Sequence, residues 1–224
     1  MGERLRVTIL SRRKWSRAHR EVQVRRVPNS PAFRTDRPWM GMMPTPSRII
    51  LLVEDAHHEQ FIRKYLKILG FGGRDLRLNK SPHGTGSAEQ WVREQFANEV
   101  DACRRRHAQT KLIVLIDADT RTVLQRMRQL DQALHEAGYA PIDNSTGEIL
   151  RLVPRRNIET WILCLNNRKV DEETDYKSPN DNWGDLIRTA VAELYAWTRP
   201  NAVVPASCVE SLHSGMRELQ KLSF

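Results

Sequence analysis

The sequence predicts an α/β fold in which a largely parallel sheet lies between helical layers. Within residues 48–165, short continuous apolar runs of the length of buried strands alternate with longer segments whose apolar residues recur at helical spacing. Strands that are apolar along their whole length are typical of a parallel sheet covered on both faces. The chain has 224 residues, of which 40% are apolar and 28% charged, so it can bury a sizeable core.

The predicted elements follow one another from residue 48 onward. Apolar runs and one shorter alternating piece predict strands at 48–53, 75–78, 111–116 and 150–153. Helical periodicity predicts helices at 61–70, 89–106, 123–138, 157–165, 184–197 and 207–219. The last helix is expected to begin with a capping box formed by Ser207 and Glu210. No apolar run approaches the roughly 18 residues of a membrane-spanning helix, which excludes a membrane protein.

Composition divides the chain into three parts. Residues 1–47 are expected to form a basic, Arg- and Pro-rich tail or linker with little regular structure, residues 48–165 the α/β domain, and residues 166–224 a mostly helical C-terminal extension packed on that domain. The first 48 residues hold 12 of the 36 Lys and Arg residues but 3 of the 27 Asp and Glu residues. The net charge of +9 is therefore confined to this leader, which is typical of a disordered tail, of residues added by an upstream start codon, or of an organelle transit peptide.

The cysteines indicate a reducing compartment. Cys103, Cys164 and Cys208 are odd in number, far apart and without a CxxC pair, which argues against a disulfide framework and a cysteine-rich zinc site. The first residues also lack the apolar core and cleavage site of a secretory signal. We therefore expect a cytoplasmic protein.

Acidic residues follow two of the predicted strands. Glu54 and Asp55 come directly after the first strand, and Asp117 and Asp119 follow the third. The carboxyl ends of parallel strands are where open sheets place their sites, and the i, i+2 spacing would point Asp117 and Asp119 to one side if strand geometry continued. Clustered carboxylates repel one another, which favours a divalent cation such as Mg²⁺ or Mn²⁺. The alternative is that these acids are solvated strand-end or helix-cap residues.

These positions resemble the signature of the Toprim fold, which occurs in topoisomerases, primases and overcoming-lysogenization-defect (OLD) nucleases. In that fold one strand ends in Glu and a later strand in Asp-x-Asp, as at Val53-Glu54 and Asp117-Ala118-Asp119 here. Segment 53–59 resembles the first motif of OLD-type nucleases and of small stand-alone bacterial Toprim-like proteins, and segment 154–161 resembles a further motif of those small proteins, some of which are linked to phage defence. The resemblance covers residues 48–165 and implies a Toprim-like three-layer domain.

The resemblance also implies metal-dependent phosphodiester chemistry on DNA or RNA. Asp117 and Asp119 would hold one or two Mg²⁺ (or Mn²⁺) ions, and Glu54 would complete the ligand set or act as a general base. Glu59, one turn after Glu54, would be an additional acid of the site. Nucleic acid is then the expected partner, together with an ATPase protein if the chain follows the OLD-type pattern.

The chain departs from the Toprim pattern in two ways. Asp55 stands where Toprim proteins usually have Gly, which adds a charge and restricts the backbone at the turn. No lysine that would stabilise a leaving group is apparent in the motifs. The glycine-rich loop at 82–87 precedes a helix and either receives phosphate or is a plain flexible loop, since it lacks the Gly-Lys-Ser/Thr of a full P-loop.

Five further side chains have a structural and a functional interpretation. Arg155 and Arg156 either contact phosphate through their guanidinium groups or form a solvated surface pair. Glu159 is either an additional acid of the site or a first-turn carboxylate stabilised by the helix dipole. His57 and His58 are expected on the surface at the start of a helix rather than as ligands.

Three hypotheses for function follow from the sequence. The first is a metal-dependent nuclease or related phosphodiester-transfer enzyme, with a role in bacterial phage defence implied by the resemblance alone. The second is a non-catalytic Toprim-like module that binds a metal or ligand and regulates a partner. The third is a receiver-like signalling domain, because receivers also begin with a strand that ends in an acidic pair. The 63 residues between Glu54 and Asp117 exceed the roughly 40 of a compact receiver passage.

Overall fold

A computed structural model describes residues 48–82, 87–106, 109–178 and 180–222. All of these residues belong to one compact unit, Met40–Phe224. The predicted basic tail at 1–47 and the centre of the glycine-rich loop at 83–86 lie outside the described residues. No helix in the described ranges is both long enough and apolar enough to cross a membrane.

The described residues contain a four-stranded sheet in which all neighbouring strands are parallel. Its strands are β1 (Arg48–Val53), β2 (Leu76–Lys80), β3 (Thr110–Leu115) and β4 (Ile149–Leu152), and their order in space is β2-β1-β3-β4. The chain thus runs outward from β1 to β2 and then returns to the other side of β1, so the order reverses between β1 and β3. In open parallel sheets such a switch point is where ligands bind.

Six helices cover this sheet in the part of the chain that the structure describes. They are α1 (Ala56–Ile68), α2 (Ala88–Arg104), α3 (Val123–Glu136), α4 (Ile158–Leu165), α5 (Trp183–Trp197) and α6 (Glu210–Gln220). Each lies where helical periodicity predicts one. The predicted capping box at Ser207 is wrong, because the N-cap of α6 is Val209, which makes no side-chain cap. A capping box is formed instead at α3, between Thr122 and Gln125.

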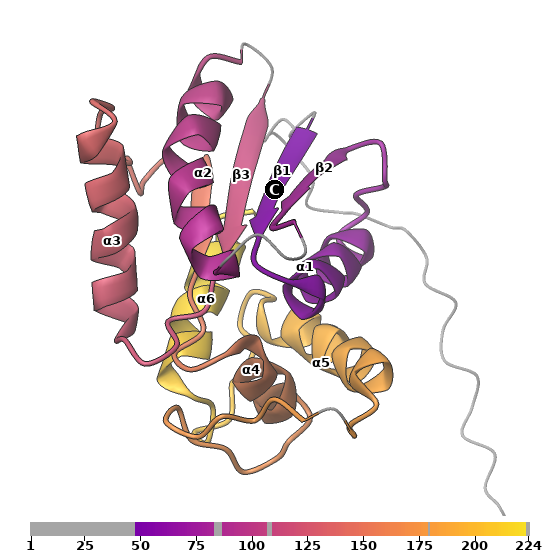
Figure 1. Cartoon of the computed structure of the whole chain (residues 1–224). Helices are drawn as coiled ribbons and strands as arrows, with labels where there is room; N and C mark the ends of the chain where they lie inside the picture. The colour runs from indigo at the N-terminus through magenta and orange to yellow at the C-terminus, as the bar shows by residue number, and fades with distance from the viewer. Residues whose placement is uncertain (1–47, 83–86, 107–108, 179, 223–224) are drawn as a thin grey trace, which may run out of the picture. The chain divides into compact units, whose positions relative to one another are not determined.

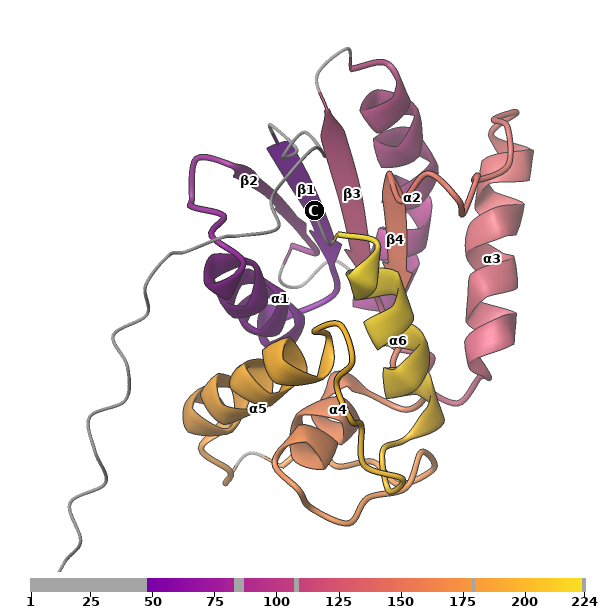
Figure 2. The same cartoon turned by 180° about the vertical axis from the view of Figure 1, so that it is seen from behind.

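Two apolar cores fill the space between the sheet and the helices. Along β1, Leu51 and Val53 point into one core, whereas Ile50 and Leu52 point into the other, as the alternation of strand side chains requires. The first core is shared with α1, α4, α5 and α6, and the second with α2 and α3 (Figures 1 and 2). The predicted α/β fold with a parallel sheet between helical layers is confirmed.

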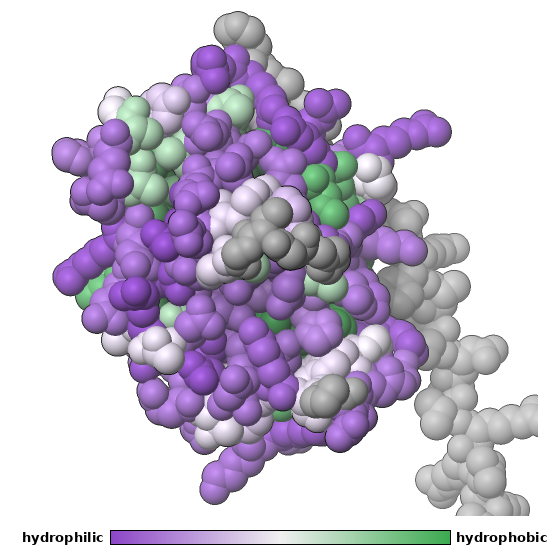
Figure 3. Space-filling view, viewed as in Figure 1, coloured by the Kyte–Doolittle hydropathy of each residue, from purple (hydrophilic) through white to green (hydrophobic). Residues whose placement is uncertain are grey.

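The C-terminal helices belong to the same core as the strands. Ile187 of α5 and Leu212 of α6 are fully buried in the cluster that contains Leu51. Gly215 lets α6 approach α4 closely, since a Cβ at this position would lie 2.3 Å from the ring of Trp161. The outer face shown in Figure 3 is mostly hydrophilic, with small and separate hydrophobic areas. The segment after residue 165 is therefore an integral layer of the fold.

Candidate metal centre

The ends of β1 and β3 bring two of the predicted acids together. Val53 lies opposite Leu115 in the parallel register, so the residues that follow these strands are neighbours. The backbone N–H of Asp117 donates a hydrogen bond of 3.1 Å to Oε2 of Glu54. The side chain of Asp117 is fully buried, whereas Glu54 is partly exposed. The prediction that acids from both strand ends meet at the edge of the sheet is confirmed for this pair.

The first turn of α1 adds a histidine to the two acids. Asp55 caps the helix by accepting hydrogen bonds from the backbone N–H groups of His57 and His58. The ring of His58 then points back to the strand ends, with Nδ1 2.8 Å from Oδ1 of Asp55 and Nε2 2.9 Å from Oδ1 of Asp117. His58 is fully buried, so the prediction that it lies on the surface is wrong.

Glu54, His58 and Asp117 form a set that fits a metal ion. Each offers one ligand atom, and these three atoms lie within 4.8 Å of one another. Oδ2 of Asp117 is buried without a hydrogen-bond partner among the described residues, although Nζ of Lys177 forms an ion pair with it at 3.6 Å. A buried carboxylate oxygen that lacks a hydrogen bond carries a desolvation cost that a cation would offset. The donor set, with two carboxylates and one imidazole, is one that divalent cations use.

Burial and neighbouring charges set the protonation of this cluster. Burial, together with the nearby negative charge of Asp117, raises the pKa of Glu54 to about 7, although the charge of His58 opposes this rise. Burial lowers the pKa of His58, but the charge and hydrogen bond of Asp117 outweigh burial and hold this pKa well above its ordinary value. Burial raises the pKa of Asp55, and its hydrogen bond with His58 more than reverses that effect. In the absence of metal the charged form of His58 is thus held between two carboxylates.

Asp119 does not join the three clustered residues. Strand geometry ends at Leu115, and Asp119 has a φ of 56°, in the left-handed region. The strand geometry on which the i, i+2 alignment of Asp119 with Asp117 depends therefore does not continue to Asp119. Its Oδ2 lies 3.3 Å from Nη2 of the buried Arg126, whose Nε also donates to the backbone carbonyl of Asp117 at 2.9 Å. Partial burial and the charge of Asp117 raise the pKa of Asp119.

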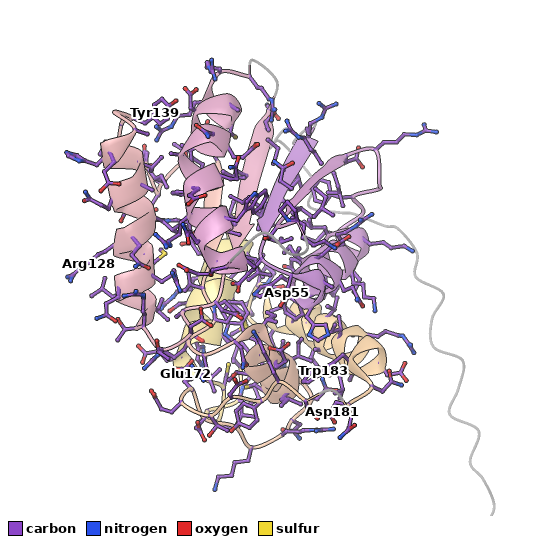
Figure 4. All side chains as sticks on the ribbon, in the orientation of Figure 1. Asp55, Arg128, Tyr139, Glu172, Asp181 and Trp183 are labelled. Carbon is purple, nitrogen blue, oxygen red and sulfur yellow. The ribbon has the colours of Figure 1, made fainter. Side chains whose placement is uncertain are left out.

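A second acid–histidine pair lies next to the cluster. Glu159, in the first turn of α4, is buried, and its Oε1 lies 2.6 Å from Nδ1 of His57. This hydrogen bond raises the pKa of His57. Both residues line an open pocket of about 460 Å³, together with Asp55, Lys177, Ser178 and Trp183. Figure 4 shows Asp55 at the end of the sheet, with Trp183 at the start of α5 close below it.

The remaining predicted site residues pair with other side chains. Glu59 forms ion pairs of 2.9 Å with Arg63 and with Lys80. Arg155 lies 2.9 Å from Glu173 and also donates to the backbone carbonyl of Arg121. Arg156 lies 3.6 Å from Asp175. The structure therefore brings Glu54 and Asp117 together and places Glu59 and both arginines in separate ion pairs.

Sequence reasoning missed two residues of the centre. His58 could have been found from its spacing, because it precedes the buried Phe61 and Ile62 by three and four residues and so shares their helix face. Lys177 lies in the segment between α4 and α5, with no motif around it, and only the fold brings it to Asp117. The charge of Asp117 raises the pKa of Lys177 against the opposing effect of burial. A lysine thus stands at the centre although the motifs show none.

No protein-family model, curated protein or solved structure matched this chain in our comparisons. The likeness to Toprim proteins accordingly rests on the short motifs around Glu54 and Asp117 and on the α/β fold class.

Proposed function

We propose that this protein is a metal-dependent phosphodiester hydrolase that acts on nucleic acid. The observation that carries the proposal is the cluster of Glu54, His58 and Asp117 at the switch point between β1 and β3. The carboxylate of Asp117 supports it further, because its buried Oδ2 has no hydrogen-bond partner among the described residues and faces only the ion pair with Lys177 at 3.6 Å. A role in phage defence and an ATPase partner extend the proposal on the strength of the motif resemblance alone.

The residues around the cluster have distinct roles in this proposal. Glu54, His58 and Asp117 would hold the ion, which when bound supplies positive charge that polarises a phosphodiester and makes water a stronger nucleophile. Lys177 lines the pocket and lies 3.6 Å from Asp117, so its ammonium group is placed to contact a phosphate oxygen that enters from this side. Without the ion the pKa of Glu54 is about 7, so binding of the ion near neutral pH would release a proton from this carboxyl group.

The observations favour the enzyme over a receiver-like domain. A phospho-acceptor must itself be reached by the phosphodonor, and the Asp117 side chain is fully buried. A metal ligand has no such requirement, because the ion mediates the contact with substrate. The hypothesis of a non-catalytic Toprim-like module involves the same cluster, so only a measurement of turnover distinguishes it from the hypothesis of an enzyme.

The test is a cleavage assay with the full chain on end-labelled single- and double-stranded DNA and RNA, in the presence of Mg²⁺ or Mn²⁺. We expect cleavage that stops in chelator and in Asp117→Asn and Glu54→Gln proteins, whose folding is checked by circular dichroism. The matched control is Glu136→Gln, which removes an exposed carboxylate at the end of α3. Binding of metal and nucleic acid without cleavage would assign the chain to the non-catalytic module, and the absence of metal binding would refute both.

A further inference from the structure

We infer that His58 is a nitrogen ligand of the metal, held in place by Asp55, and that the centre therefore prefers Mn²⁺ to Mg²⁺. This inference rests on the proposed function and concerns which of the two ions, Mn²⁺ or Mg²⁺, the same cluster prefers. The carboxylates alone do not indicate a preference for Mn²⁺. The deciding feature is a fully buried imidazole with one carboxylate on each ring nitrogen.

The two nitrogens of His58 face different surroundings. Nδ1 lies 2.8 Å from Asp55, whose Oδ1 also caps α1, so this contact is part of the helix start. A metal-ligating histidine characteristically gives its other ring N–H to a carboxylate, which fixes the tautomer and the orientation of the ring. Nε2 is then the nitrogen that faces Asp117, and one ligand atom each of His58, Asp117 and Glu54 lie within 4.8 Å of one another. Asp55 is thus a positioning residue that acts through His58.

The spacing of the donor atoms fits adjacent ligands of one ion. Two ligand atoms about 2.1 Å from an ion and at right angles to each other lie about 3.0 Å apart. Nε2 of His58 and Oδ1 of Asp117 are 2.9 Å apart. Oδ2 of Asp117, buried and without a hydrogen bond among the described residues, gives the same carboxylate a second donor atom at the centre.

The nitrogen changes which ion the centre prefers. Mg²⁺ takes oxygen ligands, demands near-ideal octahedral geometry and gives up its water reluctantly. Imidazole suits transition-metal ions, and Mn²⁺ accepts carboxylates as well. A set of two carboxylates and one imidazole therefore favours Mn²⁺ over Mg²⁺ more strongly than a set of three carboxylates would.

The experiment measures binding of the metal alone to the full chain, so it does not depend on turnover. Mn²⁺ and Mg²⁺ affinities are determined by calorimetry for the unchanged chain and for the His58→Gln and Asp55→Asn proteins. Asn is as good an N-cap as Asp, so Asp55→Asn keeps the cap of α1 while it removes the charge that faces His58. The control His135→Asn removes an exposed histidine in the last turn of α3.

We expect Mn²⁺ to bind at least about tenfold more tightly than Mg²⁺, and Asp55→Asn to weaken Mn²⁺ binding by about 10- to 100-fold. His58→Gln should abolish the preference, and His135→Asn should leave it unchanged. Electron spin-echo spectroscopy of bound Mn²⁺ should show one coupled nitrogen that changes with ¹⁵N-labelled histidine. Equal affinities for the two ions, or bound Mn²⁺ without a coupled histidine nitrogen, would overturn this inference and leave the proposed function standing. If neither ion binds, the proposed function fails as well.

Discussion

The contact between Gly215 and Trp161 makes a sharp prediction about the fold. In a Gly215→Ala protein the new Cβ would lie 2.3 Å from Cη2 and 2.9 Å from Cζ3 of the Trp161 ring. Carbon atoms prefer a separation of about 3.5–4.0 Å, so the overlap exceeds what thermal motion absorbs. The ring is fully buried and its Nε1 donates a 2.7 Å hydrogen bond to Ser211 of α6, which limits its movement.

The expected cost of Gly215→Ala follows from three effects. Overpacking of a filled core costs about 1–3 kcal/mol. Displacement of the ring would break its hydrogen bond to Ser211 and so cost about 1 kcal/mol more. Ala has a higher helix propensity than Gly, which offsets about 1 kcal/mol of this cost. The free energy of unfolding should therefore fall by about 1–3 kcal/mol, which for a chain of this size lowers Tm by about 3–10 °C.

Thermal unfolding followed by circular dichroism and tryptophan fluorescence measures this shift. The matched control is Gly184→Ala in α5, where the added Cβ would meet only Oδ1 of Asn182, at an ordinary contact distance of 3.6 Å. The control should keep or raise Tm, because helix propensity then acts alone. If both substitutions have the same effect, α6 does not pack on α4 as described, and the integral role of the C-terminal segment is refuted.

Three further predictions concern the metal centre and its supports. Burial raises the pKa of Glu54 to about 7 in the folded protein, compared with about 4.5 in the unfolded chain. The protonated carboxyl group therefore stabilises the fold fully below pH 4.5, and this stabilisation is lost as the pH rises through 7. The free energy of unfolding of Glu54→Gln, relative to that of the unchanged protein, should therefore be higher at pH 8 than at pH 5 by on the order of 2 kcal/mol, as measured by urea unfolding at both pH values. The substitution Asp119→Asn should weaken Mn²⁺ binding, measured by calorimetry, less than Asp117→Asn does, because Asp119 lies outside the cluster of Glu54, His58 and Asp117. Equal losses of affinity in the two proteins would assign Asp119 to the centre. Asn157 caps α4 by accepting a 3.1 Å hydrogen bond from the backbone N–H of Thr160 and is buried, so Asn157→Ala should cost about 1–2 kcal/mol in the same urea experiment, and an unchanged unfolding curve would contradict that role.

Local sequence predicted most of the fold because each element carries its own signal. The apolar runs at 48–53 and 111–116 are long enough for strands buried on both faces, and they form β1 and β3 within a residue of the expected bounds. The start of α6 was less predictable. Ser207 and Glu210 have the spacing of a capping box, but the helix begins only at Glu210, so Ser207 lies before the N-cap. A short motif fixes a helix start less reliably than periodicity fixes the helix.

The centre was predictable only where strand geometry determines it. Glu54 and Asp117 meet because parallel strands end at the same edge, which is a property of the fold class. The position of Asp119 could not be predicted, since Asp119 itself adopts a left-handed backbone conformation after the strand has ended. Lys177 comes from a segment far along the chain, and no local pattern reports a contact made through tertiary packing.

The charges of the centre show what a metal ion has to displace. Asp117 already faces two cationic groups, with His58 at 2.9 Å from one oxygen and Lys177 at 3.6 Å from the other. An ion that binds Asp117 competes with both, so its affinity is lowered by the contacts it breaks. The ammonium group of Lys177 is then released toward the pocket, where a phosphate group would provide the replacement anion. Metal and phosphate should therefore bind cooperatively. Each of them breaks the ion pair between Asp117 and Lys177, and once one has bound, the other no longer has to break it.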